Sequence, residues 1–282
     1  MLSGKTGLAG VMGWPVAHSL SPRLHNHWLE RAGTDGVYVP LAVRPEDLAA
    51  AVKLLPRIGF RGFNVTIPHK TAMFDLVDEV DPVARRMRAV NTVLVDESGR
   101  TTGHNTDGYG FIANLRESVP GWRADEGVAV LLGTGGAARA VASALIDAGV
   151  RGLRLVNRTR AKAEALAVEI ASWSDVPVEV ADWERRGEAL GDAGLCVQCS
   201  SLGMKGQPPL EIDLAALPRS APVADIVYVP LETPLLAAAR ERGNPVVDGL
   251  GMLLHQAVPG FRHWGGAEPV IDEAVRRLML AG

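Results

Sequence analysis

Lys70 and Asp107 are the residues whose positions most clearly indicate acid–base chemistry. Lys70 lies two residues after Pro68, where an apolar strand pattern (residues 62–67) has just ended, so we expect it in the first turn of a helix. The positive end of the helix dipole disfavours a lysine there unless an anion lies nearby. Asp107 is the expected anion. A lysine paired with a carboxylate in a partly desolvated cleft is a recognised general acid/base, although each residue alone is more often an ordinary one.

Two serines stand before another expected helix. A strand pattern ends at Gly13, Ser19 and Ser21 follow in a loop, and Pro22 is expected at the first helical position with Ser21 as the N-cap. Two hydroxyls beside a helix N-terminus can receive a carboxylate. The alternative is simple capping by Ser21, which gives Ser19 no role.

A glycine-rich turn indicates a dinucleotide site. The strand pattern VAVLLG runs into Gly-Thr-Gly-Gly-Ala-Ala and then into an alanine-rich helix, which matches G-x-G-x-x-G/A. Gly133 permits the tight turn, Gly135 lets the backbone approach a pyrophosphate, and Ala138 allows the helix to pack closely on the strand. The alternative is a glycine-rich turn without a ligand, but strand, turn, helix and following strand all fall where binding requires them.

The end of the next strand selects the cofactor. A site for NAD usually has Asp or Glu there for the ribose hydroxyls, whereas NADP needs cationic and donor groups for its 2′-phosphate. This chain has Asn157, Arg158 and Thr159, with Lys162 one turn later. Because no carboxylate occupies the position and an arginine can clamp a phosphate, the sequence predicts NADP.

These residues need a scaffold, and the pattern of the chain predicts one. Strand-like and helical segments alternate as in βαβ units, which indicates parallel sheets of the α/β class. Residues 90–108 instead resemble a hairpin and mark a domain edge. We expect a break in the C-terminal helices at Pro259, which cannot donate a backbone hydrogen bond.

Composition excludes several classes of protein. The 282 residues carry a formal net charge of -3 with both signs interspersed, which gives no basic surface for nucleic acid. No apolar run is long enough to span a bilayer, and the N-terminus lacks the features of a signal peptide, so we expect a cytoplasmic protein. Cys196 and Cys199 form a C-x-x-C in a strand pattern, where buried free thiols are favoured over a redox or zinc site.

Several motifs together resemble the shikimate dehydrogenase family over essentially the whole chain. The segments NVTIPHK, NTDG and GMLLHQA are highly specific to that family, and HSLSP, AVNTV, GTGGAA and NRT occur in its order and spacing. The resemblance implies two α/β domains, with C-terminal helices that pack back on the first. A substrate-binding catalytic domain would comprise residues 1–107 and 249–282, and a Rossmann-type NADP-binding domain residues 108–248.

The resemblance also implies roles for individual residues. Lys70 and Asp107 would be the catalytic pair, and Met252 would lie beside the nicotinamide, one helical turn before Gln256. The implied substrate-binding residues are Ser19, Ser21, Thr66, Lys70, Asn91, Asp107, Tyr228 and Gln256. The implied cofactor-binding residues are Gly133, Thr134, Gly135, Gly136, Ala137, Asn157, Arg158, Thr159, Lys162, Gly249 and Met252, and no metal is required.

The implied reaction is the reversible NADPH-dependent reduction of 3-dehydroshikimate to shikimate, in the biosynthesis of chorismate and aromatic amino acids, by a monomer or homodimer. Two departures from the family pattern are Gln198 with its two following residues, in place of Asn-x-Thr, and Arg88 in place of Gly. One rival function is that of a quinate dehydrogenase, which needs room around Ser19 and Ser21 and often prefers NAD. The other is a non-catalytic NADP-binding sensor, which would be free to lose Lys70 or Asp107.

Overall fold

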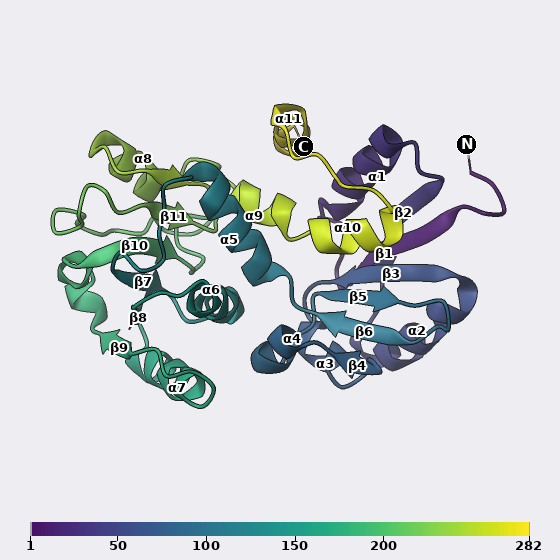
Figure 1. Ribbon diagram of the computed structural model, residues 1–282, viewed down its shortest axis with the longest axis horizontal. Coiled ribbons are helices and arrows are strands. Elements are labelled where there is room, and N and C mark those ends of the chain that lie inside the picture. Colours follow the sequence, from purple (N-terminus) through teal and green to yellow (C-terminus); the bar gives the residue numbers. More distant parts are fainter. Residues whose placement is uncertain (1, 282) are drawn as a thin grey trace. The chain divides into compact units, whose positions relative to one another are not determined.

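The computed structural model describes residues 2–281, and the chain forms two compact units (Figure 1). The first comprises the residues up to Thr106 and those from Gln256 onward, and the second comprises Asp107–His255. The expected domain edge after residue 107 therefore lies one residue from the observed one. The predicted division after residue 248 differs by seven residues from that between the compact units, since the helix that begins at Gly249 packs in the second unit.

The first unit contains a six-stranded sheet in the order β2-β1-β3-β5-β6-β4. Strands β2, β1 and β3 are parallel, β5 is antiparallel to both β3 and β6, and β4 is parallel to β6. The predicted hairpin is confirmed as β5 and β6. The strands are β1 (Gly7–Gly13), β2 (Gly36–Ala42), β3 (Phe60–Val65), β4 (Glu79–Val80), β5 (Thr92–Val95) and β6 (Thr101–His104).

Helices cover both faces of this sheet. Helices α2 (Leu48–Leu54), α3 (Lys70–Met73) and α4 (Pro82–Met87) bury apolar side chains against one face. Helices α1 (Ser21–Ala32) and α10 (Val258–Gly265) pack on the opposite face, which carries Tyr38. The terminal helix α11 (Glu273–Leu280) packs on α1. The prediction that C-terminal helices pack on the N-terminal domain is thus confirmed for α10 and α11.

The second unit contains a fully parallel sheet in the order β12-β11-β10-β7-β8-β9. Chain order reverses direction between β7 and β10, and open parallel sheets bind ligands beyond the carboxyl ends of the strands at such a point. The predicted α/β class with parallel sheets is confirmed. The strands are β7 (Val128–Leu132), β8 (Gly152–Val156), β9 (Val178–Ala181), β10 (Ala193–Gln198), β11 (Val223–Asp225) and β12 (Val246–Val247).

Two apolar clusters cover the faces of this second sheet. Helices α5 (Asp107–Ser118), α6 (Gly136–Asp147) and α7 (Arg160–Ala171) form one with the buried side chains of β7 and β8. Helix α8 (Pro234–Glu241) and residues 190–217 form the other. Helix α9 (Gly249–His255) packs on α5. Four short 3₁₀ turns complete the two units: Pro45–Asp47, Pro56–Ile58, Trp183–Arg185 and Glu188–Leu190.

The two cysteines behave as the strand pattern predicts. Cys196 lies in β10 and Cys199 directly after it, and their side chains join the clusters on opposite faces of the sheet. Both thiols are free and buried, and burial raises the pKa of Cys196 to about 12. A thiol that stays protonated is neither a good nucleophile nor a metal ligand.

The C-terminal helices also break as expected. Helix α9 ends at His255 and α10 starts at Val258, with Pro259 in the first turn of α10. Within residues 2–281, no helix combines the length and the apolar character needed to cross a membrane.

Candidate active site

In the first unit, several expected substrate-binding residues lie at one edge of the sheet. Strands β1 and β3 end at this edge and the antiparallel β5 begins there. Thr66 follows β3 and its N–H donates to the carbonyl of Met12 (2.9 Å). Asn91 immediately precedes β5, and the N–H of Val90 donates to the carbonyl of Lys70 (2.8 Å). The backbone thus holds Thr66, Lys70 and Asn91 near one another.

Lys70 opens helix α3, as the sequence predicts, and a buried histidine anchors this turn. His69 is 1% exposed and its Nε2 lies 2.8 Å from the carbonyl oxygen of Val43. Because a carbonyl only accepts, Nε2 carries the proton. The carbonyl of His69 accepts from the N–H of Met73 (2.9 Å). His69 therefore ties the start of α3 to the segment after β2, a role that the sequence analysis missed.

The expectation that Ser21 caps helix α1 is wrong. The helix begins at Ser21, the N-cap position is Leu20, and no side chain caps this end. The N–H of Ser21 instead donates to Oγ of Ser19 (3.3 Å). The two half-buried serines therefore lie together at the start of α1, and neither hydroxyl is used as a helix cap.

Gln256 is joined to the same edge through its backbone. The hydroxyl of Thr106, at the end of the first unit's main segment, donates to the carbonyl of Gln256 (2.8 Å). Thr106 also contacts Asn91, whose side-chain oxygen accepts from the Thr106 N–H (2.9 Å). Thr66, Lys70, Asn91 and Gln256 are therefore brought together within one unit.

Asp107 and Tyr228 belong to the second unit. Asp107 is half-buried and is the first residue of α5, where the positive end of the helix dipole favours a carboxylate. The pattern VADIVYVP (residues 223–230) predicts a strand through Tyr228, but β11 ends at Asp225 and Tyr228 lies in a loop. Burial raises the pKa of Tyr228, so its hydroxyl stays protonated.

A buried carboxylate shapes the loop of Tyr228. Oδ1 of Asp225 accepts from the N–H of Val227 (2.9 Å), and Oδ2 accepts from the hydroxyl of Thr233 (2.7 Å), which also caps α8. Burial raises the pKa of Asp225 to about 6, while its two hydrogen bonds act in the opposite direction. The loop is thereby tied at both ends to one side chain.

The glycine-rich turn has the geometry of a phosphate site. Gly133 has φ of 111°, its N–H donates to the carbonyl of Val156 (2.8 Å), and a Cβ there would lie 3.0 Å from the backbone nitrogen of Ser200. Only glycine suits that position. A Cβ on Gly135 or Gly136, at the start of α6, would meet nothing within 4 Å. The backbone there is open to an anion, and the helix N-terminus supplies amide donors.

Unpaired positive charge lies at the end of β8. Arg158 and Lys162 are exposed and form no ion pair with any described residue. Nδ2 of Asn157 donates to the carbonyl of Thr159 (2.9 Å), which shapes the loop. The neighbouring Arg160, in contrast, pairs with two carboxylates. The loop after β8 can therefore receive a 2′-phosphate through Arg158 and Lys162.

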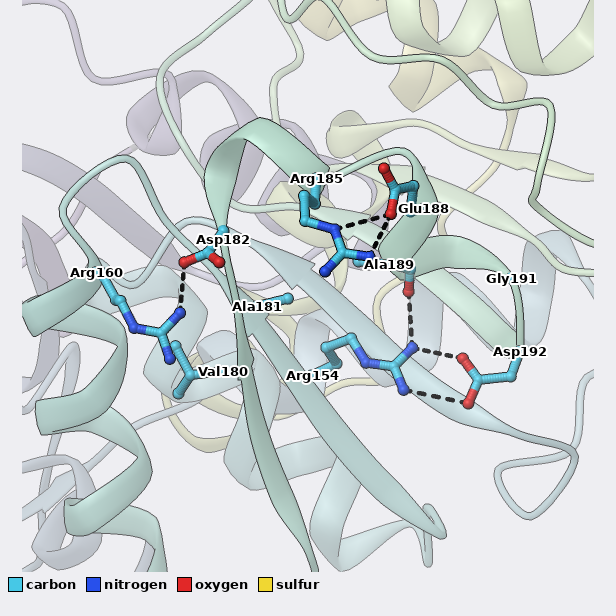
Figure 2. A pocket seen from close by; sticks show the side chains of 10 residues that line it. All are labelled: Arg154, Arg160, Val180, Ala181, Asp182, Arg185, Glu188, Ala189, Gly191 and Asp192. Atoms are coloured by element: carbon cyan, nitrogen blue, oxygen red, sulfur yellow. Dashed lines mark hydrogen bonds and ion pairs between the residues drawn. The ribbon is translucent and has the colours of Figure 1, made fainter.

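A separate hollow of about 610 Å³ lies in the second unit (Figure 2). None of the predicted site residues lines it, and each arginine in its wall is paired with a carboxylate. It thus presents no net positive charge to an anion. The pairs are Arg154 with Asp192, Arg160 with Asp182, and Arg185 with Glu188.

The two departures from the family pattern have local explanations. Gln198 is fully buried; its Nε2 donates to the carbonyl of Leu202 (2.9 Å) and its Oε1 accepts from the N–H of Ser200 (3.0 Å), which closes the turn after β10. Arg88 ends α4 in the left-handed conformation (φ 47°), and its guanidinium lies 5.3 Å from the ring centre of Phe74.

The strand order and the glycine turn of the second unit are typical of NAD(P)-binding domains. The first unit adds a polar edge of its sheet, formed by Thr66, Lys70, Asn91 and Gln256, as expected for an NAD(P)-dependent α/β oxidoreductase with a separate substrate-binding unit. Residues 11–93 match the family model described as "Shikimate dehydrogenase substrate binding domain". The chain is 55% identical over 280 residues to the "Shikimate dehydrogenase (NADP(+))" of Paramagnetospirillum magneticum, covering 99% of this chain and 100% of that protein. The chain belongs to the shikimate dehydrogenase family.

Solved structures agree with this assignment. Shikimate 5-dehydrogenase from Thermus thermophilus in complex with NADP(H) and shikimate is 37% identical, with a TM-score of 0.83 over 97% of this chain and 100% of that chain. Quinate dehydrogenase from Corynebacterium glutamicum in complex with NAD is 34% identical, with a TM-score of 0.89 over 98% and 99% of the two chains. The fold is thus shared by enzymes of both specificities.

Proposed function

We propose that the protein catalyses the reversible NADPH-dependent reduction of 3-dehydroshikimate to shikimate. The observation that carries this proposal is the similarity, over the full chain, to proteins named shikimate dehydrogenase (NADP(+)). The first unit would bind substrate and the second unit NADP. A cytoplasmic location and a monomeric or homodimeric state remain predictions.

We assign acid–base catalysis to Lys70 and Asp107. Bound NADPH would supply a hydride for the carbonyl carbon, and Lys70 would supply the proton to the oxygen as negative charge develops there. Asp107 would support the protonated lysine, since the first turn of α5 favours an ionised carboxylate. The placement of Lys70 at the polar edge of the sheet, beside Asn91, supports this role.

Substrate recognition follows from the donors available. Ser19 and Ser21, adjacent at the start of α1, would hold the carboxylate with help from the protonated Tyr228. Residues at the polar edge of the first unit would bind the ring hydroxyls. A substrate that lacks one hydroxyl would leave a polar protein group unpaired, which is a strong basis for selectivity. These edge residues are Thr66, Asn91 and Gln256.

The cofactor proposal rests on the second unit. Phosphates would bind at the turn of residues 133–137, where the backbone is open, and the 2′-phosphate at Arg158 and Lys162. Gly249 opens α9, and the half-buried Met252 lies three residues further along the helix, where it would contact the nicotinamide.

One experiment tests the specificity. Initial rates are measured with purified protein for shikimate and quinate, each with NADP and with NAD. A preference for shikimate with NADP supports the proposal. Preference for quinate with NAD would instead support the second candidate, a quinate dehydrogenase, which the similarity to the C. glutamicum enzyme makes worth testing. Cofactor binding without turnover of either substrate would contradict both and support the sensor.

A second experiment tests the assignment of Lys70. The variant Lys70→Met should lower kcat by about 10² to 10⁴, the usual contribution of a positioned acid/base, and leave the Kd of NADP nearly unchanged. The exposed Lys53, on α2 of the same unit, provides the matched control Lys53→Met, which should retain wild-type rates. Near-normal turnover of Lys70→Met would rule out the acid–base role.

A further inference from the structure

A chain of buried polar side chains runs beneath the substrate edge of the first unit. It begins at Tyr38, which is 1% exposed and donates its hydroxyl proton to Oδ1 of Asn64 (2.6 Å). Nδ2 of Asn64 donates to Oγ1 of Thr92 (3.0 Å), and Oγ1 of Thr92 lies 3.0 Å from Oδ1 of Asn91. All four residues are buried in strands β2, β3 and β5 or directly beside them.

Backbone groups fix the direction of these hydrogen bonds. The N–H of Thr106 can only donate, so the atom that it meets on Asn91 (2.9 Å) must be the amide oxygen. The hydroxyl of Thr106 has one proton and two acceptors within reach, the carbonyl of Gln256 (2.8 Å) and Oδ1 of Asn91 (3.1 Å), and the shorter contact is the one to Gln256. The hydroxyl of Thr92 also donates to Oδ1 of Asn91 (3.0 Å), and it is able to donate because its oxygen accepts from Nδ2 of Asn64.

The consequence concerns which end of Asn91 can meet a ligand. Its oxygen accepts from the Thr106 N–H and the Thr92 hydroxyl, so its NH₂ group points away from these two donors. An amide that rotated by 180° would place NH₂ against the Thr106 N–H, two donors in contact, and would leave a buried donor unsatisfied. The side chain of Asn91 is therefore held as a donor.

We propose that Tyr38, Asn64 and Thr92 form a positioning relay that presents the Asn91 amide as a hydrogen-bond donor to a substrate oxygen. The proposal rests on the proposed function, in which Asn91 binds a ring hydroxyl. In this arrangement Asn91 selects substrate atoms that accept a hydrogen bond. Thr92 controls substrate affinity through Asn91 and does not itself need to touch the substrate.

The test compares Thr92→Val, which keeps the shape and removes the hydroxyl, with Thr92→Ser, which keeps the hydroxyl. Thr92→Val should lower kcat/KM for shikimate about tenfold, the effect of one misplaced hydrogen bond, while the KM for NADP stays at the wild-type value. Thr92→Ser should restore wild-type kcat/KM. A purely structural defect would change both KM values together and would also lower the melting temperature of the Ser variant.

The decisive measurement adds Asn91→Ala. If Thr92 acts through Asn91, Thr92→Val should have no further effect on kcat/KM in the Asn91→Ala background, because residues of one network are not additive. Multiplied effects, or wild-type kcat/KM for Thr92→Val alone, would overturn the relay.

The relay and the proposed function fail separately. Wild-type protein without shikimate activity would refute the function before any variant is compared, whereas an active wild type matched by Thr92→Val would refute only the relay. Should Thr92→Val not fold, Tyr38→Phe tests the other end: a raised KM for shikimate at unchanged KM for NADP supports the relay, and an unchanged KM for shikimate overturns it.

Discussion

Replacement of His25 should remove a large part of the acid sensitivity of the first unit. His25 is fully buried and lies among aromatic rings: it stacks on Tyr38 with ring centres 4.1 Å apart, and it also contacts Trp28, Phe261 and Trp264. This burial disfavours the charged imidazolium and lowers the pKa of His25 from 6.5 to about 3.

The sign and size of the effect follow from linkage. Between pH 6.5 and pH 3 the unfolded state binds a proton at His25 and the folded state does not, so the unfolding free energy falls as the pH falls. With 1.36 kcal/mol for each pKa unit, the full effect is on the order of 5 kcal/mol, of which about 2 kcal/mol is lost between pH 8 and pH 5. That loss is a large part of the stability of an ordinary domain.

The assay is urea unfolding of wild type and His25→Phe at pH 8, 6 and 5, with hydrogen exchange of peptides from β2 and β3 to locate the response. Phenylalanine keeps an aromatic ring beside Tyr38 but does not titrate; its larger volume can cost about 1–3 kcal/mol, equally at each pH. Between pH 8 and pH 5, the unfolding free energy of wild type should fall by about 2 kcal/mol more than that of His25→Phe. His18→Gln, a change at an exposed histidine, should lose as much as wild type.

Parallel stability curves for wild type and His25→Phe would refute the reasoning, because they would mean that His25 takes up a proton in the folded protein as readily as in the unfolded chain. His25→Gln provides a second non-titrating variant, which should show the same reduced pH dependence even if its absolute stability is lower.

Three further substitutions should alter stability in ways that urea unfolding can measure. Arg88→Gly should be about 1 kcal/mol more stable than Arg88→Ala, since both lose the contact with Phe74 and only glycine relieves the left-handed backbone; equal stability would contradict this. The unfolding free energy of Asp225→Asn should rise by up to about 3 kcal/mol relative to that of wild type as the pH rises from 4 to 7, because the raised pKa of Asp225 (about 6) makes burial of its ionised form unfavourable. A difference in unfolding free energy that does not vary with pH would refute this prediction. Gly251→Ala should lower the unfolding free energy by about 1–3 kcal/mol, since a Cβ at this position would lie 1.8 Å from the side-chain oxygen of the buried Asn114. Wild-type stability of this variant would show that α5 and α9 can move apart at no cost.

Local sequence patterns predicted the sheets and the glycine turn because the physical requirement there is local. The turn at Gly133 needs a positive φ that glycine adopts easily, and the strand before it and the helix after it are adjacent in sequence. The absence of Asp or Glu at the end of β8 can likewise be read directly from residues 157–159. Such features require no knowledge of distant segments.

The errors arose where tertiary contacts decide. Ser21 looks like an N-cap, yet the helix starts at Ser21 and its N–H meets Ser19. Tyr228 continues an apolar run, yet the chain leaves the sheet at Asp225. The side chain of Asp225 accepts a hydrogen bond from the N–H of Val227, which starts a turn. The second compact unit extends seven residues beyond the predicted edge at residue 248, since Gly251 lets α9 pack against Asn114, a contact between distant residues.

The polar relay was missed although Asn64 and Thr92 lie inside the recognised motifs. Asn64 and Thr92 are buried polar residues of strands β3 and β5, and a buried polar side chain costs free energy unless it is hydrogen-bonded. That signal predicts that partners exist. It does not identify them, because the partner of Asn64 on β2 is Tyr38, 26 residues away in sequence.

The aromatic cluster and the relay meet at Tyr38, so acid stability and substrate affinity should be linked in the first unit. The ring of Tyr38 stacks on neutral His25, while its hydroxyl holds Asn64. Protonation of His25 would place a charge among aromatic side chains, and the cluster must open to hydrate it. Opening displaces the ring that orients Asn64 before the rest of the unit unfolds. The KM for shikimate in wild type should therefore rise at a higher pH than that at which the β3 amides lose protection from hydrogen exchange, and His25→Phe should abolish this early rise in KM.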